Sequence, residues 1–308
     1  MIERVTIIGT GLIGASIGLA LRENGFAGEI AGWDSSAAAL DAAVQIGAVT
    51  TRLVSSPENL FSQDRAEGAP REPGGDLVLL GGPVLSILDW MERLAPVCSP
   101  GTLITDVGST KLTITSAAGR LYNQPGRARF LPGHPMAGKE AGGAALAEAK
   151  LFHNAAWLFT PVQEAESPDP PNVSCNPLED EWRAWVARFG ARTLDLNAER
   201  HDEICAWVSH LPQMLSTALA ALLEETFSHD AEARNQIDAI GGRALRETTR
   251  LGLSPYSMWR DVALTNTEPI AATLHGLEQR LAHLRENLRT PELREEFRLA
   301  NEFRRRRG

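Results

Sequence analysis

The first 160 residues alternate short apolar runs with amphipathic segments. Five of the runs are typical of buried strands: "RVTIIG", "EIAGWD", "DLVLLGG", "TLITDVGS" and "ARFLPGH". Between them, the pattern predicts helices in "LIGASIGLALRENG", "SAAALDAAVQIG" and "VLSILDWMERLAP". Strands that alternate with helices indicate βαβ units, whose crossovers are right-handed. We therefore expect an α/β domain built on a doubly wound parallel sheet with helices on both faces.

The pattern changes in the second half of the chain. Polar loops rich in proline or glycine are expected at 62–75 and 160–181, and the helix and strand in "EWRAWVARFGARTLDL" are interpreted as part of the sheet. From Ala198 onward, apolar residues recur at three- and four-residue steps, which predicts helices with a wide apolar stripe. We therefore divide the chain into a sheet domain at 1–197 and an all-α domain at 198–308.

Two features of the helical half bear on its packing. Pro212 lies inside the apolar stripe and removes a backbone donor, so we expect a kink there. A later stretch has heptad spacing and requires a facing helix; its apolar positions are Ile270, Leu274, Leu277, Leu281, Leu284 and Leu288. The facing helix lies either in the same chain or in a second copy. Long apolar helices with little sheet to cover favour a homodimer.

Composition and charge exclude several classes of protein. The 308 residues are 43% hydrophobic and 22% charged, which allows a sizeable core. A net charge of -9 argues against nucleic-acid binding, and the basic run "RRRRG" is interpreted as a solvated tail. Three scattered cysteines predict neither a metal site nor disulfides, as in a reducing cytoplasm. The chain shows no apolar run long enough for a membrane helix and no signal peptide.

A glycine-rich turn follows the first strand and opens a helix. Gly9, Gly11 and Gly14 form the pattern GxGxxG, with Leu12 and Ile13 before the last glycine. The first glycine permits a tight turn, the second lets the backbone approach a pyrophosphate, and the third brings the helix close to the sheet. Unpaired N–H groups at the helix N-terminus then meet the phosphates. In this context the motif predicts a Rossmann-type dinucleotide site rather than a bare turn.

Residues at the ends of the second and third strands bear on the cofactor. Asp34 follows Gly14 by 20 residues, where a carboxylate accepts from a ribose 2′-hydroxyl and repels a 2′-phosphate. This favours NAD over NADP, whereas a role of Asp34 as a helix N-cap would leave the choice open. Gly82 and Pro83 close the third strand where the nicotinamide half is expected to pass, unless Pro83 only shapes the turn.

A histidine held between two prolines follows the fifth strand. In "RFLPGHP", His134 lies between Pro132 and Pro135, and "TLITDVGSTK" brings Ser109 to a neighbouring strand end. Ligands of open α/β sheets bind beyond the carboxyl ends of the strands, so His134 is expected beside the nicotinamide. An imidazole with a pKa near neutrality takes the proton of an alcohol that is being oxidised, and Ser109 can orient both groups. A purely structural histidine is the alternative.

Together these motifs resemble the prephenate/arogenate dehydrogenase family, the oxidative decarboxylases of tyrosine biosynthesis. The matching segments, in the family's order, are "GTGLIGASIGLAL", "DVGSTK", "GHPMAG", "HDEICAWVSHLP" and "LRETTRLGLSPYSMWRD". The resemblance implies an N-terminal NAD(P) domain and a C-terminal helical dimerisation domain. It also implies a cyclohexadienol substrate that becomes aromatic on losing hydride and carboxylate.

The resemblance implies roles for single residues. His134 matches the histidine that hydrogen-bonds the ring hydroxyl of the substrate, and Ser109 matches the serine that supports it beside the nicotinamide. Arg250 matches the arginine that binds a substrate carboxylate, a task that suits the fork of a guanidinium. Trp259 falls where the family has a tryptophan near the pocket.

Other positions bear on the side chain of the substrate. His201 and His210 match family positions on one long helix, but their nine-residue spacing turns them about 180° apart, so only His210 is expected to face the pocket. Where the family often has a second histidine, this chain has Gln213, which hydrogen-bonds without charge. Lys139 stands where a threonine is common and favours prephenate, whereas Glu140 keeps an acidic position and favours arogenate. The choice of substrate stays open.

The expected function is oxidative decarboxylation of prephenate to 4-hydroxyphenylpyruvate with NAD+; the alternative is an arogenate dehydrogenase. A β-hydroxyacid or imine reductase on the same plan usually relies on a lysine in the helical domain, but no lysine follows Lys150. A non-catalytic NAD-binding protein is a further alternative, in which His134, Ser109 and Arg250 would be incidental.

Overall fold

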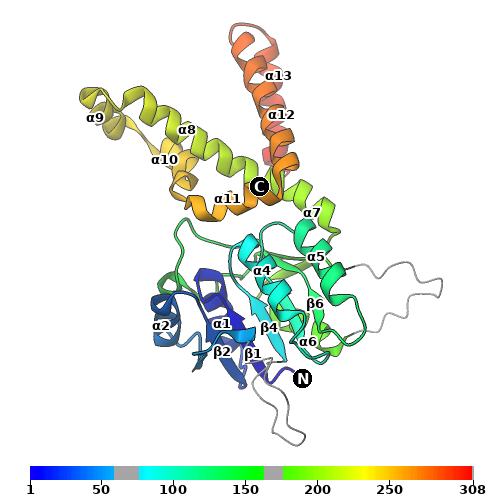
Figure 1. Ribbon diagram of the computed structural model, residues 1–308. Coiled ribbons are helices and arrows are strands. Elements are labelled where there is room, and N and C mark those ends of the chain that lie inside the picture. Colours follow the sequence, from blue (N-terminus) through cyan, green and yellow to red (C-terminus); the bar gives the residue numbers. More distant parts are fainter. Residues whose placement is uncertain (59–75, 163–175, 307–308) are drawn as a thin grey trace, which may run out of the picture.

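The protein is a sheet domain from which two helical arms project (Figure 1). The structure, a computed structural model, describes residues 1–58, 76–162 and 176–306. The loop predicted at 62–75 and most of the one predicted at 160–181 lie outside these ranges. Within them, no helix has the length and apolar character that a membrane span requires.

Six parallel strands form the main sheet, in the order β3-β2-β1-β4-β5-β6. They are β1 (Arg4–Ile8), β2 (Glu29–Trp33), β3 (Thr51–Arg52), β4 (Leu77–Leu80), β5 (Leu103–Asp106) and β6 (Arg129–Leu131). The strand order reverses between β1 and β4, the point at which doubly wound sheets bind ligands. The parallel, doubly wound sheet expected from the sequence is therefore confirmed, and the two-residue strand β3 is added to it.

Helices cover both faces of this sheet. They are α1 (Leu12–Glu23), α2 (Ala37–Gln45), α4 (Val84–Leu94), α5 (Leu112–Tyr122) and α6 (Pro177–Arg188). Successive residues of a strand alternate between two cores: Ile7 belongs to the core that contains α1 and α6, and Ile8 to the core that contains α4 and α5. Because both faces are buried, the strands are apolar throughout. The helix α5 was not predicted, since its β-branched first turn (Leu112–Thr115) gives a weak helical signal.

A second sheet of three strands carries His134. It consists of β7 (Gly133–Pro135), β8 (Ala156–Phe159) and β9 (Arg192–Asp195), with β7 antiparallel and β9 parallel to β8. The single strand predicted for "ARFLPGH" is wrong, because Pro132, which has no N–H group, separates β6 from β7. The expectation that "EWRAWVARFGARTLDL" continues the main sheet is also wrong, because its strand pairs with β8.

The helical half begins at α7, whose first turn is capped by the Asn197 side chain. Its elements are α7 (Ala198–Cys205), η2 (Ala206–His210), α8 (Leu211–Phe227), α9 (Ala231–Ile240), α10 (Arg243–Thr249), η3 (Arg250–Leu253), α11 (Tyr256–Thr265), α12 (Thr267–Glu286) and α13 (Glu292–Arg305). The kink expected at Pro212 stays a prediction, and the structure shows a π-helical turn, η2, directly before the proline. Such turns often occur at functional sites.

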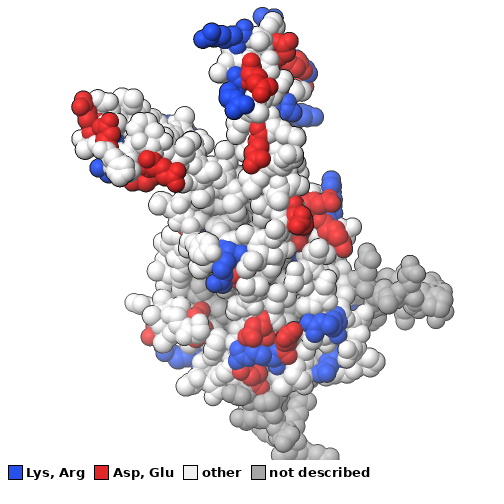
Figure 2. All heavy atoms as spheres, turned by 45° about the horizontal axis from the view of Figure 1, so that its top comes forward, with Lys and Arg blue, Asp and Glu red and all other residues white. Residues whose placement is uncertain are grey.

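Two arms, α8 to α10 and α12 with α13, extend away from the sheet domain (Figure 1). Their apolar residues are widely exposed, with Leu222 at 60% and Leu281 at 51%. An ion pair between Arg280 and Glu296 joins α12 to α13, so the heptad helix has a neighbour in its own chain. The expected basic tail is in part helical, because α13 runs to Arg305. On the face drawn in Figure 2, charges of both signs are interspersed and the junction of arms and sheet domain is largely uncharged.

Candidate functional site

A cavity of about 550 Å³ lies where the strand ends of the main sheet meet the helical half. Its wall contains residues from several predicted groups: Gly11, Leu12, Ile13, Gly82, Pro83, Ser109, His134, Lys139, Glu140, His210 and Trp259. These segments meet because the carboxyl ends of parallel strands share one edge of a sheet. Five of the predicted residues are not part of the wall: Gly9, Gly14, Asp34, Gln213 and Arg250.

The glycine turn has the shape of a phosphate cradle. Gly9 has φ +94°, and a Cβ atom on it would lie 2.9 Å from the carbonyl carbon of Gly81. A Cβ on Gly14 would lie 2.1 Å from the Gly9 oxygen, so only glycine lets α1 approach the turn this closely. A Cβ on Gly11 would meet no atom within 4 Å, which leaves open space in front of the helix N-terminus. This arrangement fits a bound pyrophosphate.

Asp34 ties the glycine turn to the end of β2. Its Oδ2 accepts hydrogen bonds from the Thr10 backbone N–H (2.7 Å) and hydroxyl (3.2 Å), and its Oδ1 accepts from the Ser36 N–H (2.9 Å). The N-cap of α2 is Ser36, whose Oγ accepts from the Ala39 N–H, and not Asp34. A carboxylate oxygen accepts more than one hydrogen bond, so Oδ1 retains capacity for a ribose hydroxyl.

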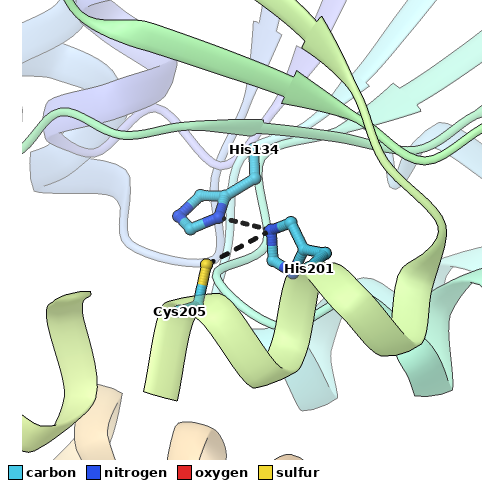
Figure 3. A group of neighbouring side chains, drawn as sticks. All are labelled: His134, His201 and Cys205. Carbon is cyan, nitrogen blue, oxygen red and sulfur yellow. Dashed lines mark hydrogen bonds between the residues drawn. The ribbon is translucent and has the colours of Figure 1, made fainter. Parts of the chain in front are cut away.

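His134 is buried on the cavity wall and backed by a second histidine (Figure 3). Its Nδ1 lies 2.9 Å from Nε2 of His201 on α7, and Nδ1 of His201 lies 2.8 Å from Oδ1 of Asp202. Burial lowers the pKa of His134 well below its ordinary value of 6.5, and its neighbours His201, Lys111 and His210 lower that pKa further. His134 is therefore a neutral imidazole at neutral pH.

A network of buried charges holds this part of the site in place. Asp202 accepts from the backbone N–H groups of Lys111 (2.7 Å) and Leu112 (2.9 Å) at the start of α5. The Lys111 ammonium group is fully buried in an ion pair with Asp106, and burial lowers the pKa of Lys111. Asp106 also accepts from the Gly133 N–H (3.1 Å). The network thus joins α7, β5 and β7, three elements far apart in the sequence.

His134, His201 and Cys205 place three potential metal-ligand atoms within 4.8 Å of one another (Figure 3). The arrangement does not suit a cation. The 2.9 Å separation of the two histidine nitrogens is that of a hydrogen bond, and the atom near Cys205 is the same Nε2 (3.6 Å). Burial raises the pKa of the Cys205 thiol to about 12, which disfavours the thiolate that a metal needs. The Lys111 ammonium group nearby opposes a further positive charge.

Two further residues of the cavity wall, His210 and Trp259, carry ring N–H groups. The amide nitrogen of Asn266 donates to the Asp202 carbonyl (2.9 Å) and to Nδ1 of His210 (3.1 Å), so the proton of His210 is on Nε2. Burial lowers the pKa of His210 to about 4. Nε2 of His210 and Nε1 of Trp259 are buried, and no described residue is their hydrogen-bond partner. Their rings pack edge to face, with centroids 5.8 Å apart.

The charged residues at this end of the site are paired. Arg250, on η3, forms an ion pair with Glu140, the acidic residue among those that line the cavity. Lys139 donates to the Leu146 carbonyl (2.7 Å) and pairs with Glu148, so its ammonium group supports the loop after β7.

Gln213 lies behind the cavity wall, where its amide is saturated. Nε2 donates to the Leu251 carbonyl (2.7 Å) and to the Thr217 hydroxyl (3.1 Å), and Oε1 accepts from the Ser254 hydroxyl (3.0 Å). The substrate contact expected for Gln213 stays a prediction, and the contacts that the structure shows are structural ones. They hold η3, the segment that carries Arg250.

Comparison with known proteins identifies the family. The model of the prephenate dehydrogenase nucleotide-binding domain matches residues 17–175, and the model of the prephenate dehydrogenase dimerization domain matches residues 197–303. The chain belongs to the prephenate dehydrogenase family. The resemblance noted in the sequence is thus confirmed.

Relatives and solved structures agree with this assignment. The chain is 31% identical to a prephenate dehydrogenase of Bacillus subtilis, over 88% of this chain and 66% of the relative, so it spans about two thirds of that protein. It is 26% identical to a cyclohexadienyl dehydrogenase of Zymomonas mobilis, over 92% of this chain and 87% of the relative.

Two solved structures are similar over nearly the whole chain. A prephenate dehydrogenase from A. aeolicus, in complex with hydroxyphenyl propionate and NAD+, has a TM-score of 0.82 and 26% identity over 100% of this chain and 99% of that one. A Synechocystis arogenate dehydrogenase has a TM-score of 0.71 and 27% identity over 99% of this chain and 100% of that one.

In this member of the prephenate dehydrogenase family, the structure adds residues that the sequence did not single out. Asp202, Lys111 and Asn266 support the two histidines of the cavity wall, and His201 contacts His134 from behind instead of lining the cavity. His201 and Asp202 could have been identified from the "HD" pair that they form in the first turns of a helix that also carries His210. The contact with His134, 67 positions away, has no local signature.

Proposed function

We propose that the protein catalyses the oxidative decarboxylation of prephenate to 4-hydroxyphenylpyruvate with NAD+, a step of tyrosine biosynthesis. Membership of the prephenate dehydrogenase family supports a dehydrogenase, and the similar A. aeolicus structure contains NAD+. The domains proposed are 1–197 for the dinucleotide and 198–308 for substrate binding and dimerisation. Two free thiols, Cys98 and Cys205, are in keeping with the proposed location in the cytoplasm.

The glycine turn is proposed to hold the dinucleotide. The open space at Gly11 and the N-terminus of α1 suit the pyrophosphate, while Gly82 and Pro83 provide the wall beside the nicotinamide. When bound, NAD+ supplies the acceptor for the hydride. Asp34 presents a carboxylate at the end of β2 that accepts from a 2′-hydroxyl and repels a 2′-phosphate, which supports NAD over NADP.

His134 is proposed as the base for the ring hydroxyl of the substrate. The imidazole is neutral, lies on the cavity wall and shares it with Ser109, whose hydroxyl can orient the substrate. Removing the hydroxyl proton favours departure of hydride from the same carbon, and the resulting dienone becomes aromatic when CO2 leaves. Because aromatisation drives the reaction, the protein mainly has to align the groups.

The observation that carries the choice of prephenate is a pair of buried ring donors, on two residues of the cavity wall, that have no partner among the described residues. Nε2–H of His210 and Nε1–H of Trp259 suit the oxygens of a keto acid, whereas the ammonium group of arogenate needs an acceptor. Glu140 could provide one, but its negative charge is offset by the guanidinium of Arg250. Arg250 is proposed to anchor a substrate carboxylate.

A homodimer is proposed as the working unit. The match of residues 197–303 to a dimerization domain and the exposed apolar residues of both arms support it. No nucleic-acid or membrane partner is proposed.

The test is a spectroscopic assay of reduced cofactor with prephenate and with arogenate, each with NAD+ and with NADP+. We expect prephenate with NAD+ to be turned over best. His134→Asn should retain NAD+ binding and lose at least about 100-fold in kcat, the usual loss for a general base. Faster turnover of arogenate would overturn the choice of substrate, and unchanged turnover by His134→Asn would remove His134 from the mechanism.

A further inference from the structure

We propose that Asp202 and His201 act as positioning residues that fix the tautomer of His134, so that its Nε2 faces the cavity without a proton. The inference rests on the proposed function, because it concerns the base of that reaction. It follows from the hydrogen bonds of three buried side chains, taken in order from Asp202 to the cavity.

The first step concerns Asp202, which is an acceptor on both oxygens. Oδ1 accepts from the Lys111 N–H and Oδ2 accepts from the Leu112 N–H, at the positive end of α5. Backbone donors on both oxygens favour the ionised carboxylate. The 2.8 Å contact with Nδ1 of His201 therefore has the histidine as donor, so the proton of His201 is on Nδ1.

The proton position of His201 in turn fixes the proton position of His134. His201 is fully buried, and burial lowers its pKa despite the hydrogen bond to Asp202, so it is neutral and has a single ring proton. With that proton on Nδ1, its Nε2 can only accept. The 2.9 Å contact then makes Nδ1 of His134 the donor. In Figure 3 the other nitrogen of His134 points away from His201. That nitrogen is Nε2. Because His134 belongs to the cavity wall, we assign the lone pair of Nε2 to the cavity side.

The third step is the consequence for the reaction. The proton of the substrate hydroxyl moves to Nε2 of His134, which becomes an imidazolium that still donates through Nδ1. The carboxylate of Asp202, at the end of this row of hydrogen bonds, stabilises the positive charge through His201. Two other ionisable groups lie near His134: the ion pair of Lys111 with Asp106, and His210, which is neutral. Neither provides a second acceptor for Nδ1 of His134. In the opposite tautomer, Nε2 would carry a proton and could not accept the hydroxyl proton.

The decisive measurement is a ¹⁵N NMR spectrum of the intact protein labelled at histidine, recorded at neutral pH without substrate. The two nitrogens of a neutral imidazole differ widely in chemical shift according to which one carries the proton. The signals of His134 are assigned by their loss in His134→Asn. We expect Nδ1 of His134 to be protonated and Nε2 to be bare; a proton on Nε2 would overturn the proposal.

Variants then connect the tautomer with turnover. In Asp202→Asn an amide N–H₂ can face Nδ1 of His201, which reverses both tautomers, and kcat should fall at least about 100-fold with little change in KM or NAD+ affinity. His201→Leu removes the hydrogen bonds that link Asp202 to His134 and should have a similar effect on kcat. His201→Gln keeps an acceptor oxygen and should recover part of the loss. Cys205→Ala is the matched control, since the thiol contacts His201 (3.6 Å) but is not one of the groups that link Asp202 to His134.

The possible outcomes separate this inference from the proposed function. A wild-type protein that oxidises neither prephenate nor arogenate would contradict the function, while the tautomer is still decided by the spectrum. Full kcat in both Asp202→Asn and His201→Leu would overturn the positioning role even if the tautomer is as expected. A loss of kcat in Cys205→Ala equal to that in His201→Leu would indicate a packing effect and also count against it. Circular dichroism and NAD+ binding check that each variant is folded.

Discussion

Three buried histidines at the cavity have lowered pKa values and different tasks. Burial is the main cause in all three, so His134, His201 and His210 are neutral imidazoles at neutral pH. What distinguishes them is the atom that each nitrogen faces. The hydrogen bond from Asn266 places the proton of His210 on Nε2, whereas the proposed tautomer of His134 leaves its Nε2 with a lone pair. The chemistry of the site therefore depends on tautomers rather than on charge.

The lowered pKa of His134 predicts the acid side of the pH–rate profile. The base works when it is unprotonated, so activity is lost only as the pH falls through its pKa, which lies well below 6.5. We expect kcat/KM for prephenate to stay constant from about pH 8 to below pH 6.5. A histidine with an ordinary pKa would instead halve the rate near pH 6.5. Initial rates across this range, with stability checked at each pH, distinguish the two cases.

The same burial predicts acid sensitivity of the fold. His210 has a pKa of about 4 in the folded protein against 6.5 when exposed, so the unfolded chain takes up a proton first as the pH falls below 6.5. Stability is therefore lost between pH 6.5 and about 4, by on the order of 3 kcal/mol from this residue. Urea unfolding at several pH values measures the slope. In His210→Asn the slope should be smaller; an identical slope would contradict the assignment.

At the scale of elements, the site depends on how closely α1 approaches β1. The helix begins against the glycine turn, and the position of Gly14 leaves no room for a methyl group beside the Gly9 oxygen. The π-helical turn η2 is the second special element, because it brings His210 to the cavity on the helix that also carries His201. In both cases the candidate site residues lie where a helix is irregular or closely packed: at the crowded start of α1 and at the π-helical turn η2.

Gly14→Ala tests this close approach. The added Cβ would lie 2.1 Å from the Gly9 oxygen, so α1 must move away from the turn and the phosphate cradle widens. We expect NAD+ affinity, measured by titration calorimetry, to fall at least about tenfold. Gly119→Ala in α5 is the matched control, because its Cβ would make only an ordinary contact, at 3.7 Å from Val162. Equal affinities for the two variants would contradict the crowding argument.

At the scale of the whole molecule, the arms are the part that a single chain leaves incomplete. Leu222 on α8 and Leu281 on α12 expose more than half of their surface, and both helices extend from the sheet domain (Figure 1). An exposed apolar surface of this kind marks an interaction site. A second copy is the partner proposed here, since the matching family model describes a dimerization domain.

Leu281→Asp tests the assembly. A buried carboxylate at an apolar interface is costly, so we expect a dimer in the wild type and a monomer in this variant by light scattering. Val54→Asp is the control. Val54 is also apolar, is 91% exposed and lies on the sheet domain, so this variant should leave the dimer intact. A monomeric wild type, or a dimer that survives Leu281→Asp, would show that the arms do not join two chains through this helix.

Much of the fold follows from local patterns. The alternation of strands and helices, the glycine turn and the helical second half are all visible in the sequence, because each depends on spacing within about 20 residues. Some elements were misjudged or missed, and three of them have a clear physical reason. Pro132 divides one apolar run between two sheets, β9 pairs with β8 instead of extending the main sheet, and α5 begins with β-branched residues. Strand pairing is a long-range choice that no local pattern encodes.

The candidate site divides in the same way. The sequence by itself determined which residues are candidates for the chemistry, namely His134 at a strand end and the glycines before α1, because residue type and local spacing are enough for that. Only the tertiary structure decided what those residues face: His201 behind His134, Asp202 behind His201, and Gln213 outside the cavity. The reason is that a hydrogen bond between residues 134 and 201 depends on how two domains pack, and the chain order contains no record of that distance.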